Sequence, residues 1–245
     1  MRIRDRGYVM VKYNGTNEKV KLRITCPDQS CYTYLISDRG AYDTFPLTAG
    51  NGSYALQVLE NVAGDTYTVS LAQSINVNIE DEFLPFLYPN QYVNFHTDSK
   101  AVSKGSDLAK DTYSDLDVVQ NIYNYVIKNI SYDTEKAQNV SYGYVPDIDD
   151  TLSSKKGICF DYAALMASML RSQNIPTKLE VGYSGDAYHA WISTYIDDKG
   201  WVDDIIQFNG NTWQIMDPTL AATNDSAAVK KYIGDGSHYV VKYTY

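Results

Sequence analysis

The hydrophobic and polar positions in the N-terminal part of the chain alternate with a period of two, which is the pattern of a half-buried β-strand. In residues 19–25, Val20, Leu22 and Ile24 fall on one face, with polar side chains between them. Similar runs predict strands over 31–36, 53–59, 67–71 and 75–79, and glycine-containing turns separate several of them. Short strands joined by turns are typical of a small antiparallel sandwich. We therefore expect a β-sandwich-like domain, with its linker, over residues 1–96.

Beyond residue 96 the hydrophobic positions recur at helical spacing. Val119, Ile122 and Val126 lie three and four residues apart, which predicts an amphipathic helix. Ser114 or Asp115 is the expected cap, because short polar side chains before such a run accept hydrogen bonds from the first backbone N–H groups.

A second helix is expected over residues 159–172, ended by Asn174 and Pro176. Strands are then predicted over 178–183, 188–196, near 201–208, over 212–216 and over 239–243. Helices followed by a sheet indicate an α+β arrangement rather than a doubly wound one, so we assign residues 97–245 to a second, α+β domain.

Composition and charge restrict the function without naming it. The net charge of −9 argues against a nucleic-acid partner, since phosphate contacts need a basic face. No apolar run approaches the roughly 20 residues of a membrane-spanning helix, so we predict no transmembrane segment. The chain has 23 Tyr against 6 Phe and 3 Trp. Because tyrosine joins an apolar ring to a polar hydroxyl, this excess fits sheet faces exposed to solvent or to a polymeric partner.

The three cysteines are too few for a disulfide scaffold. Cys26 and Cys31 flank a turn, so they can form either a short disulfide or two reduced thiols. Residues 1–6 contain no apolar signal core, which fits a cytosolic protein as well as an exported one whose leader has been removed.

The third cysteine has the strongest potential for chemistry. Cys159 follows Gly157, which permits a tight turn, and falls in the first turn of the predicted helix. The partial positive charge and unpaired N–H groups there favour a thiolate and suit an oxyanion. Asp161 is expected to cap or neutralise this helix start, and its charge would oppose the thiolate if it pointed inward. The alternative is that Cys159 is a small buried hydrophobic residue.

His189 and Asp217 would complete a reactive group with Cys159. His189 begins one predicted strand and Asp217 ends another. The intervening lengths allow these two strands to be adjacent and antiparallel, with both side chains directed toward the helix start. A nucleophile, a base and a residue that orients the base form the general catalytic triad.

Three motifs make a family resemblance specific: Gly157-Ile158-Cys159-Phe160-Asp161-Tyr162-Ala163, Tyr188-His189-Ala190-Trp191 and Met216-Asp217-Pro218-Thr219. Together with residues 170–176 and 182–183, they resemble the transglutaminase-like superfamily over about residues 110–222. The resemblance implies a papain-like core, in which a helix bearing Cys159 packs on an antiparallel sheet carrying His189 and Asp217.

The resemblance also implies a chemistry and a setting. The Cys159 thiolate would form a thioester with a protein or peptide amide, and an amine or water would then release the acyl group. The backbone N–H of Cys159 is one expected oxyanion donor, and Tyr142 or Tyr144 is the other. No cofactor or metal is implied. The N-terminal part resembles β-domains of bacterial secreted and surface proteins, so we expect an extracytoplasmic location and cell-envelope polypeptides among the substrates.

Two rival functions remain: a cysteine peptidase or amidase with the same triad, and a non-catalytic binding or scaffold protein that keeps the fold. Trp191 and Trp201 are expected either to line a substrate groove or to pack in the core.

Other polar residues have simpler interpretations. Asp147, Asp149 and Asp150 form an acidic loop without the fixed glycine and closing Glu of a calcium-binding loop. His96 and His238 lie outside recognisable motifs and are expected to be structural or exposed.

Overall fold

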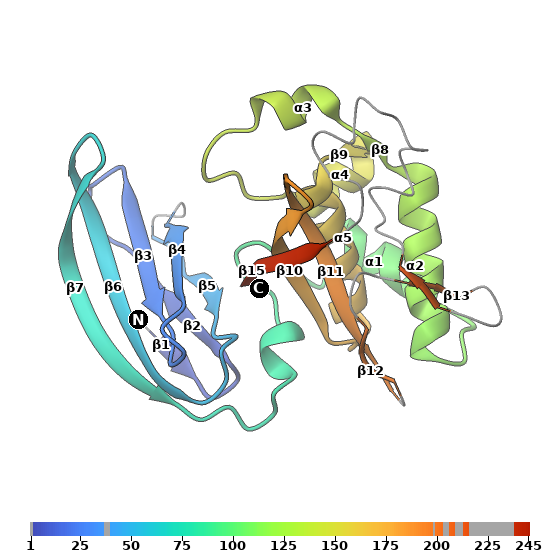
Figure 1. Cartoon of the computed structure of the whole chain (residues 1–245), viewed down its shortest axis with the longest axis horizontal. Helices are drawn as coiled ribbons and strands as arrows, with labels where there is room; N and C mark the ends of the chain where they lie inside the picture. Colours follow the sequence, from blue (N-terminus) through green and yellow to red (C-terminus); the bar gives the residue numbers. More distant parts are fainter. Residues whose placement is uncertain (1, 37–39, 198, 203–205, 209–212, 216–237) are drawn as a thin grey trace. The chain divides into compact units, whose positions relative to one another are not determined.

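The computed structural model describes residues 2–36, 40–197, 199–202, 206–208, 213–215 and 238–245. The chain divides into two compact units, Met1–Pro85 and Phe86–Tyr245, which are coloured along the sequence in Figure 1. The assignment of domains to residues 1–96 and 97–245 stays a prediction.

The described residues of the first unit form two antiparallel sheets. The larger has the order β4-β3-β6-β7, with β4 at Cys31–Leu35, β3 at Val20–Thr25, β6 at Gly52–Ala63 and β7 at Thr66–Val77. The smaller has the order β1-β2-β5, with β1 at Arg2–Arg4, β2 at Tyr8–Val11 and β5 at Asp43–Pro46. The two sheets meet where the rings of Tyr34 and Phe45 pack with centroids 4.8 Å apart. The strand-rich N-terminal part is thus confirmed.

The strands of this unit differ from the prediction in two respects. Residues 67–71 and 75–79 were expected to be separate strands, but β7 runs unbroken through the polar residues between them. The hydrophobic pattern lapses there because both faces of β7 are exposed from Thr68 to Ser74, not because the strand ends. Strands β1, β2 and β5 were not predicted, because runs of three or four residues carry little periodicity.

The second unit is built around one buried helix. Its helices are α1 (Lys100–Ala109), α2 (Asp115–Asn129), α3 (Thr134–Asn139), α4 (Ile148–Ser154) and α5 (Cys159–Ser172), and a 3-10 turn, η1, spans Leu84–Phe86 at the junction of the units. Every residue of α5 from Asp161 to Arg171 is buried. The helix contacts α1, α2 and α4 as well as strands β10 (Thr177–Ser184) and β11 (Ala187–Ile196), as Figure 1 shows.

The predicted helices are found with their caps. Helix α5 has the predicted bounds, and the side chain of Ser114 caps α2 by accepting a hydrogen bond from the backbone N–H of Asp117. Ser114, rather than Asp115, is therefore the cap.

The main sheet of the second unit is antiparallel and has the order β12-β11-β10-β15, with β12 at Gly200–Val202 and β15 at Tyr239–Thr244. Among the described residues, two small sheets accompany it: β13 (Ile206–Phe208) with β14 (Trp213–Ile215), and β8 (Ser131–Tyr132) parallel to β9 (Lys156–Gly157). Helices and an antiparallel sheet in one unit confirm the α+β class.

The strand order corrects one expectation. The separations allowed the strand before Asp217 to lie beside the strand of His189, but in the described residues β14 pairs with β13, whereas β11 pairs with β10 and β12. The chain turns back after β11, so that Val202 pairs with Thr194, and β12 borders only the end of β11 that is remote from His189. The run predicted near 201–208 is accordingly two short strands, β12 and β13.

Arg171 joins three separate parts of the second unit. Its buried guanidinium donates to the carbonyl oxygens of Thr177 at 2.9 Å, Tyr88 at 2.8 Å and Tyr245 at 2.8 Å. Burial lowers the pKa of Arg171 to about 9. The ring of Tyr92 packs on the ring of Tyr245, with centroids 4.7 Å apart. This contact and the hydrogen bond from Arg171 to Tyr88 attach the segment after residue 86 to the rest of the second unit.

Candidate active site

Cys159 is the first residue of α5, and its side chain is half-buried. Its backbone N–H is among the first four of the helix, which have no intrahelical acceptor. The position therefore combines an accessible thiol with the positive end of a helix of 14 residues.

Gly157 is required beside Cys159, but for a reason other than the predicted one. A Cβ at Gly157 would lie 2.8 Å from Cβ of Asp161 and 3.3 Å from Cγ2 of Thr151. The left-handed residue of this turn is Lys155, with φ 56°. Gly157 thus permits a close approach of the chain to α5, and Lys155 provides the turn.

His189 lies near the start of β11, opposite Gly182 of β10, and is 1% exposed. Its ring stacks on Trp191 with centroids 6.0 Å apart and approaches Tyr239 at 6.4 Å. Burial raises the pKa of the neighbouring Tyr188, and the charges of other side chains, Cys159 among them, add to this shift. Strand β11, which carries both Tyr188 and His189, packs against α5.

Asp217 lies outside the described residues, so the triad of Cys159, His189 and Asp217 stays a prediction. Cys159 lies on α5 and His189 on β11, and these two elements are in contact in the described part of the chain.

Asp161 is fully buried and binds three groups (0% exposed). Its Oδ2 accepts the backbone N–H of Ile158 at 2.9 Å, which caps α5 as expected. Its Oδ1 accepts the hydroxyl of Tyr144 at 2.5 Å, and Nζ of Lys136 lies 2.7 Å from Oδ2. The carboxylate of Asp161 is therefore directed into the protein, and the ammonium of Lys136 neutralises its charge.

Lys136 and Tyr144 also bind each other. Nζ of Lys136 donates to the Tyr144 hydroxyl at 2.6 Å. Burial raises the pKa of Tyr144 above its ordinary value, and the hydrogen bond to Asp161 and the charge of Asp161 raise it further. Tyr144 is therefore neutral and donates its only hydroxyl proton to Asp161. We call Lys136, Tyr144 and Asp161 the helix-start cluster.

This cluster affects the choice of the second oxyanion donor. The Tyr144 proton is already used by Asp161, whereas the side chain of Tyr142 is 79% exposed. Both assignments stay predictions, but Tyr144 would have to leave Asp161 in order to donate to a substrate.

Sequence reasoning identified Asp161 but missed Lys136. No motif includes Lys136, and it comes from α3, a helix of six residues that was not predicted. The available signal was the cap of that helix, Asp133, whose side chain accepts the backbone N–H of Lys136.

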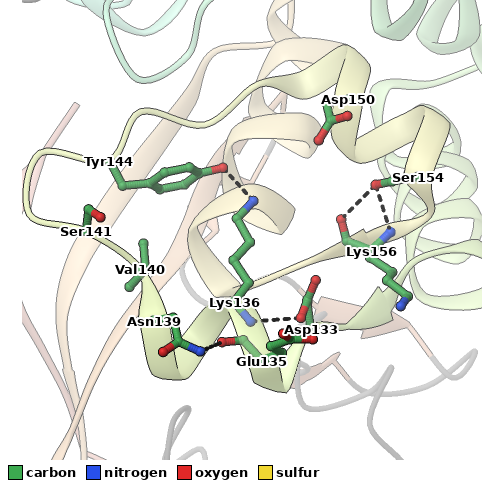
Figure 2. Close-up of a pocket in the computed structure, with 10 residues that line it drawn as sticks. All are labelled: Asp133, Glu135, Lys136, Asn139, Val140, Ser141, Tyr144, Asp150, Ser154 and Lys156. Atoms are coloured by element: carbon green, nitrogen blue, oxygen red, sulfur yellow. Dashed lines mark hydrogen bonds between the residues drawn. The ribbon is translucent and has the colours of Figure 1, made fainter.

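A pocket of about 670 Å³ lies beside the helix-start cluster. It is lined by Asp133, Glu135, Lys136, Asn139, Val140, Ser141, Tyr144, Asp150, Ser154 and Lys156. Figure 2 shows Lys136 reaching toward Tyr144 within this pocket, while the hydrogen bonds of Lys156 to Ser154 involve only its backbone.

The two tryptophans differ in exposure. Trp191 is 2% exposed and donates its indole N–H to the buried carboxylate of Glu180 at 3.0 Å, so it belongs to the core rather than to an open groove. Trp201 is half-buried, with Nζ of Lys178 3.9 Å from its ring centroid. Its place in a substrate groove stays a prediction.

The three aspartates expected to form an acidic loop instead lie at the start of α4, with Asp149 and Asp150 in its first turn. Asp147 caps α4 by accepting from the backbone N–H groups of Asp149 and Asp150. Asp149 in turn accepts from Lys100 and Ala101 at the start of α1. These hydrogen bonds account for two of the three carboxylates without a metal.

His96 and His238 are exposed, and Cys26 and Cys31 carry free thiols. Within the described ranges, no group of three or more His, Cys, Asp or Glu side chains is arranged to hold a metal ion. None of the described helices is both long and apolar enough to cross a membrane.

Comparison with known proteins finds a family match within the second unit. Residues 103–203 match the sequence profile of the transglutaminase-like superfamily. The UPF0252 protein of Methanocaldococcus jannaschii is 30% identical over 118 residues, or 42% of this chain and 34% of that protein. Kyphoscoliosis peptidase of Mus musculus is 30% identical over 107 residues, or 38% of this chain and 16% of that protein. The alignments thus span about a third or less of these relatives.

Solved structures resemble the chain more distantly. The periplasmic domain of TgpA from Pseudomonas aeruginosa has a TM-score of 0.47 at 14% identity, covering 92% of this chain and 90% of that one. The red sea bream transglutaminase has a TM-score of 0.35 at 15% identity, covering 90% of this chain and 49% of that one.

Proposed function

Because residues 103–203 carry a transglutaminase-like core, we propose that the protein is a cysteine enzyme that acts on amide groups of proteins or peptides. The observation that carries this proposal is the position of Cys159, half-buried at the start of α5 and close to the strand that bears His189. A helix start favours the thiolate, and a neighbouring imidazole can remove the thiol proton.

The chemistry follows from these groups. His189 takes the proton of the Cys159 thiol, and the thiolate attacks the amide carbonyl. The negative oxygen of the tetrahedral intermediate is held by the backbone N–H of Cys159. When the C–N bond breaks, His189 returns the proton to the leaving amine, and a thioester remains. Asp217 is proposed to hold the imidazole ring in the required tautomer.

The acyl group then leaves by one of two routes. A primary amine attacks the thioester, His189 accepts its proton, and the thiol is restored with a new amide bond. Alternatively water attacks, giving a carboxylic acid. The name of the mouse relative, a peptidase, favours the second route. A scaffold without catalysis is the rival from another class.

Alkylation of the native protein tests the thiolate. Iodoacetamide labelling is followed at Cys159 by peptide mass analysis, in the wild type and in His189→Ala. We expect His189→Ala to slow the labelling at neutral pH by about tenfold or more, since the base that takes the thiol proton is lost. His96→Ala, which changes an exposed histidine of the same unit, is the matched control. Equal labelling of all three proteins would remove the basis of the proposal.

Product analysis separates transfer from hydrolysis. The protein is incubated with a glutamine-rich protein and a fluorescent primary amine, with Cys159→Ser as the inactive control. Incorporated label indicates transfer, whereas new carboxylates or cleavage fragments indicate hydrolysis. On the resemblance of the N-terminal part to β-domains of bacterial secreted and surface proteins, we also propose an extracytoplasmic location and cell-envelope substrates. Fractionation of the producing cells would test the location.

A further inference from the structure

Asp161 presents an electrostatic difficulty for the proposed function. It is a fully buried residue two positions after Cys159, in the same helical turn. An uncompensated carboxylate in the first turn of α5 would oppose a thiolate at the same helix start by charge repulsion, and burial would strengthen the effect because few waters screen it. The carboxylate is nevertheless needed, because it caps α5 by accepting a hydrogen bond from the backbone N–H of Ile158.

The helix-start cluster removes this difficulty. Lys136 places its ammonium 2.7 Å from Oδ2, the same oxygen that accepts the Ile158 N–H. Tyr144 binds the other oxygen, Oδ1, so both carboxylate oxygens are fixed. The three residues come from α3, the segment after it and α5.

We propose, on the basis of the proposed function, that Lys136 is a positioning residue of the active site, which cancels the charge of Asp161 so that this carboxylate can cap α5 without opposing the Cys159 thiolate. Tyr144 holds the carboxylate in place from its other side. Lys136 does not touch the reacting atoms and acts through Asp161.

Other charged or titratable groups surround the helix start. Asp150 of α4 acts on Tyr144 through its charge and lines the pocket together with Lys156 of β9. From β11 come Tyr188 and His189. The experiment therefore has to separate the effect of Lys136 from a general change of charge in this region.

The experiment measures the rate of Cys159 alkylation between pH 5 and 10, with the label located by peptide mass analysis, in the full chain. In Lys136→Met the charge of Asp161 is no longer cancelled, so we expect the midpoint of the rate profile to rise by about one pH unit. Labelling below the midpoint is then about tenfold slower. In the double variant Lys136→Met/Asp161→Asn the carboxylate charge is also gone, and most of the rate should return.

Lys156→Met is the matched control, because it removes one positive charge from the same pocket but leaves Asp161 paired. We expect its profile to follow the wild type. If Lys156→Met shifts the midpoint as much as Lys136→Met, the effect is one of general charge and the inference is wrong. If the double variant is as slow as Lys136→Met, the role of Lys136 is structural, and the inference is again wrong.

The result for His189→Ala distinguishes this failure from that of the proposed function. If His189→Ala slows the labelling but Lys136→Met does not, the proposed enzyme function is supported and the proposed role of Lys136 is wrong. When His189→Ala has no effect, the proposed function itself fails, whatever the lysine variants show. Far-UV circular dichroism of each variant confirms that the comparison is made on folded protein.

Discussion

The ammonium of Lys136 and the carboxylate of Asp161 form an ion pair of 2.7 Å whose two sides are unequally buried. The Asp161 side chain is fully buried, whereas that of Lys136 is 27% exposed. Removal of the lysine therefore leaves the Asp161 carboxylate charged, unpaired and out of reach of water. Removal of the carboxylate leaves the Lys136 ammonium unpaired, but water can solvate it.

This inequality predicts different losses of stability. Lys136→Met should lower the free energy of unfolding by about 3 kcal/mol, because an unpaired buried charge remains. Asp161→Asn should cost about 1 to 2 kcal/mol, mainly through the weakened cap and hydrogen bonds. Urea denaturation measures both values. The double variant should lose less than the sum of the two, and simple additivity would show that the pair does not interact.

Alkaline pH should destabilise the protein through Tyr144. Its pKa is raised in the folded state by burial and by Asp161, so above pH 10 the unfolded chain loses a proton that the folded chain keeps. Stability is therefore fully present below pH 10 and falls as the pH rises. In Tyr144→Phe the decline of the free energy of unfolding between pH 10 and 11 should be smaller by up to about 1.4 kcal/mol per pH unit. An unchanged slope would contradict the buried position of this hydroxyl.

Gly157→Ala should disturb both stability and the thiol. The added methyl group meets Cβ of Asp161 at 2.8 Å, so the cap of α5 must shift, at a cost of about 2 kcal/mol. Alkylation of Cys159 should slow at the same time. Gly200→Ala is the control from the same unit: its backbone is strained at φ +83°, but no atom lies within 4 Å of the added methyl. It should lose stability without any change in the alkylation rate.

Arg171→Met should lower the free energy of unfolding by about 3 kcal/mol, because the carbonyl groups of Thr177, Tyr88 and Tyr245 lose a charged hydrogen-bond donor. The loss is limited because the buried charge, whose desolvation lowers the pKa of Arg171 to about 9, is removed as well. Arg171→Lys keeps the charge but not the planar fork, and should also be destabilised. Thermal denaturation would count against this account if the lysine variant were as stable as the wild type.

Local rules predicted much of the fold and the position of one site residue. The capping preference of Ser114 and the limits of α5 depend on neighbours within a few residues, and both were predicted correctly. The family motifs placed Cys159 at a helix start in the same way. Such features are set by short-range hydrogen bonding and periodicity, which a single sequence contains.

The remaining features depend on contacts between elements. Lys136 and Asp161 meet only because α3 and α5 come together, and nothing in either local sequence indicates the other. The need for glycine at position 157 likewise comes from the approach of Asp161. The pairing of β14 with β13 rather than with β11 could not be predicted, because sequence separation alone does not determine which strands pair.

The hydrogen bonds of Arg171 also bear on the order in which the second unit folds. Two of its acceptors, at Tyr88 and Tyr245, are 83 and 74 residues away along the chain. Closing loops of this length costs conformational entropy before any contact compensates for it. Until the segments of Tyr88 and Tyr245 have packed against the helix, the guanidinium of Arg171 is better solvated by water. These hydrogen bonds should therefore form after the folding transition state. A change at Arg171 should therefore accelerate unfolding far more than it slows refolding.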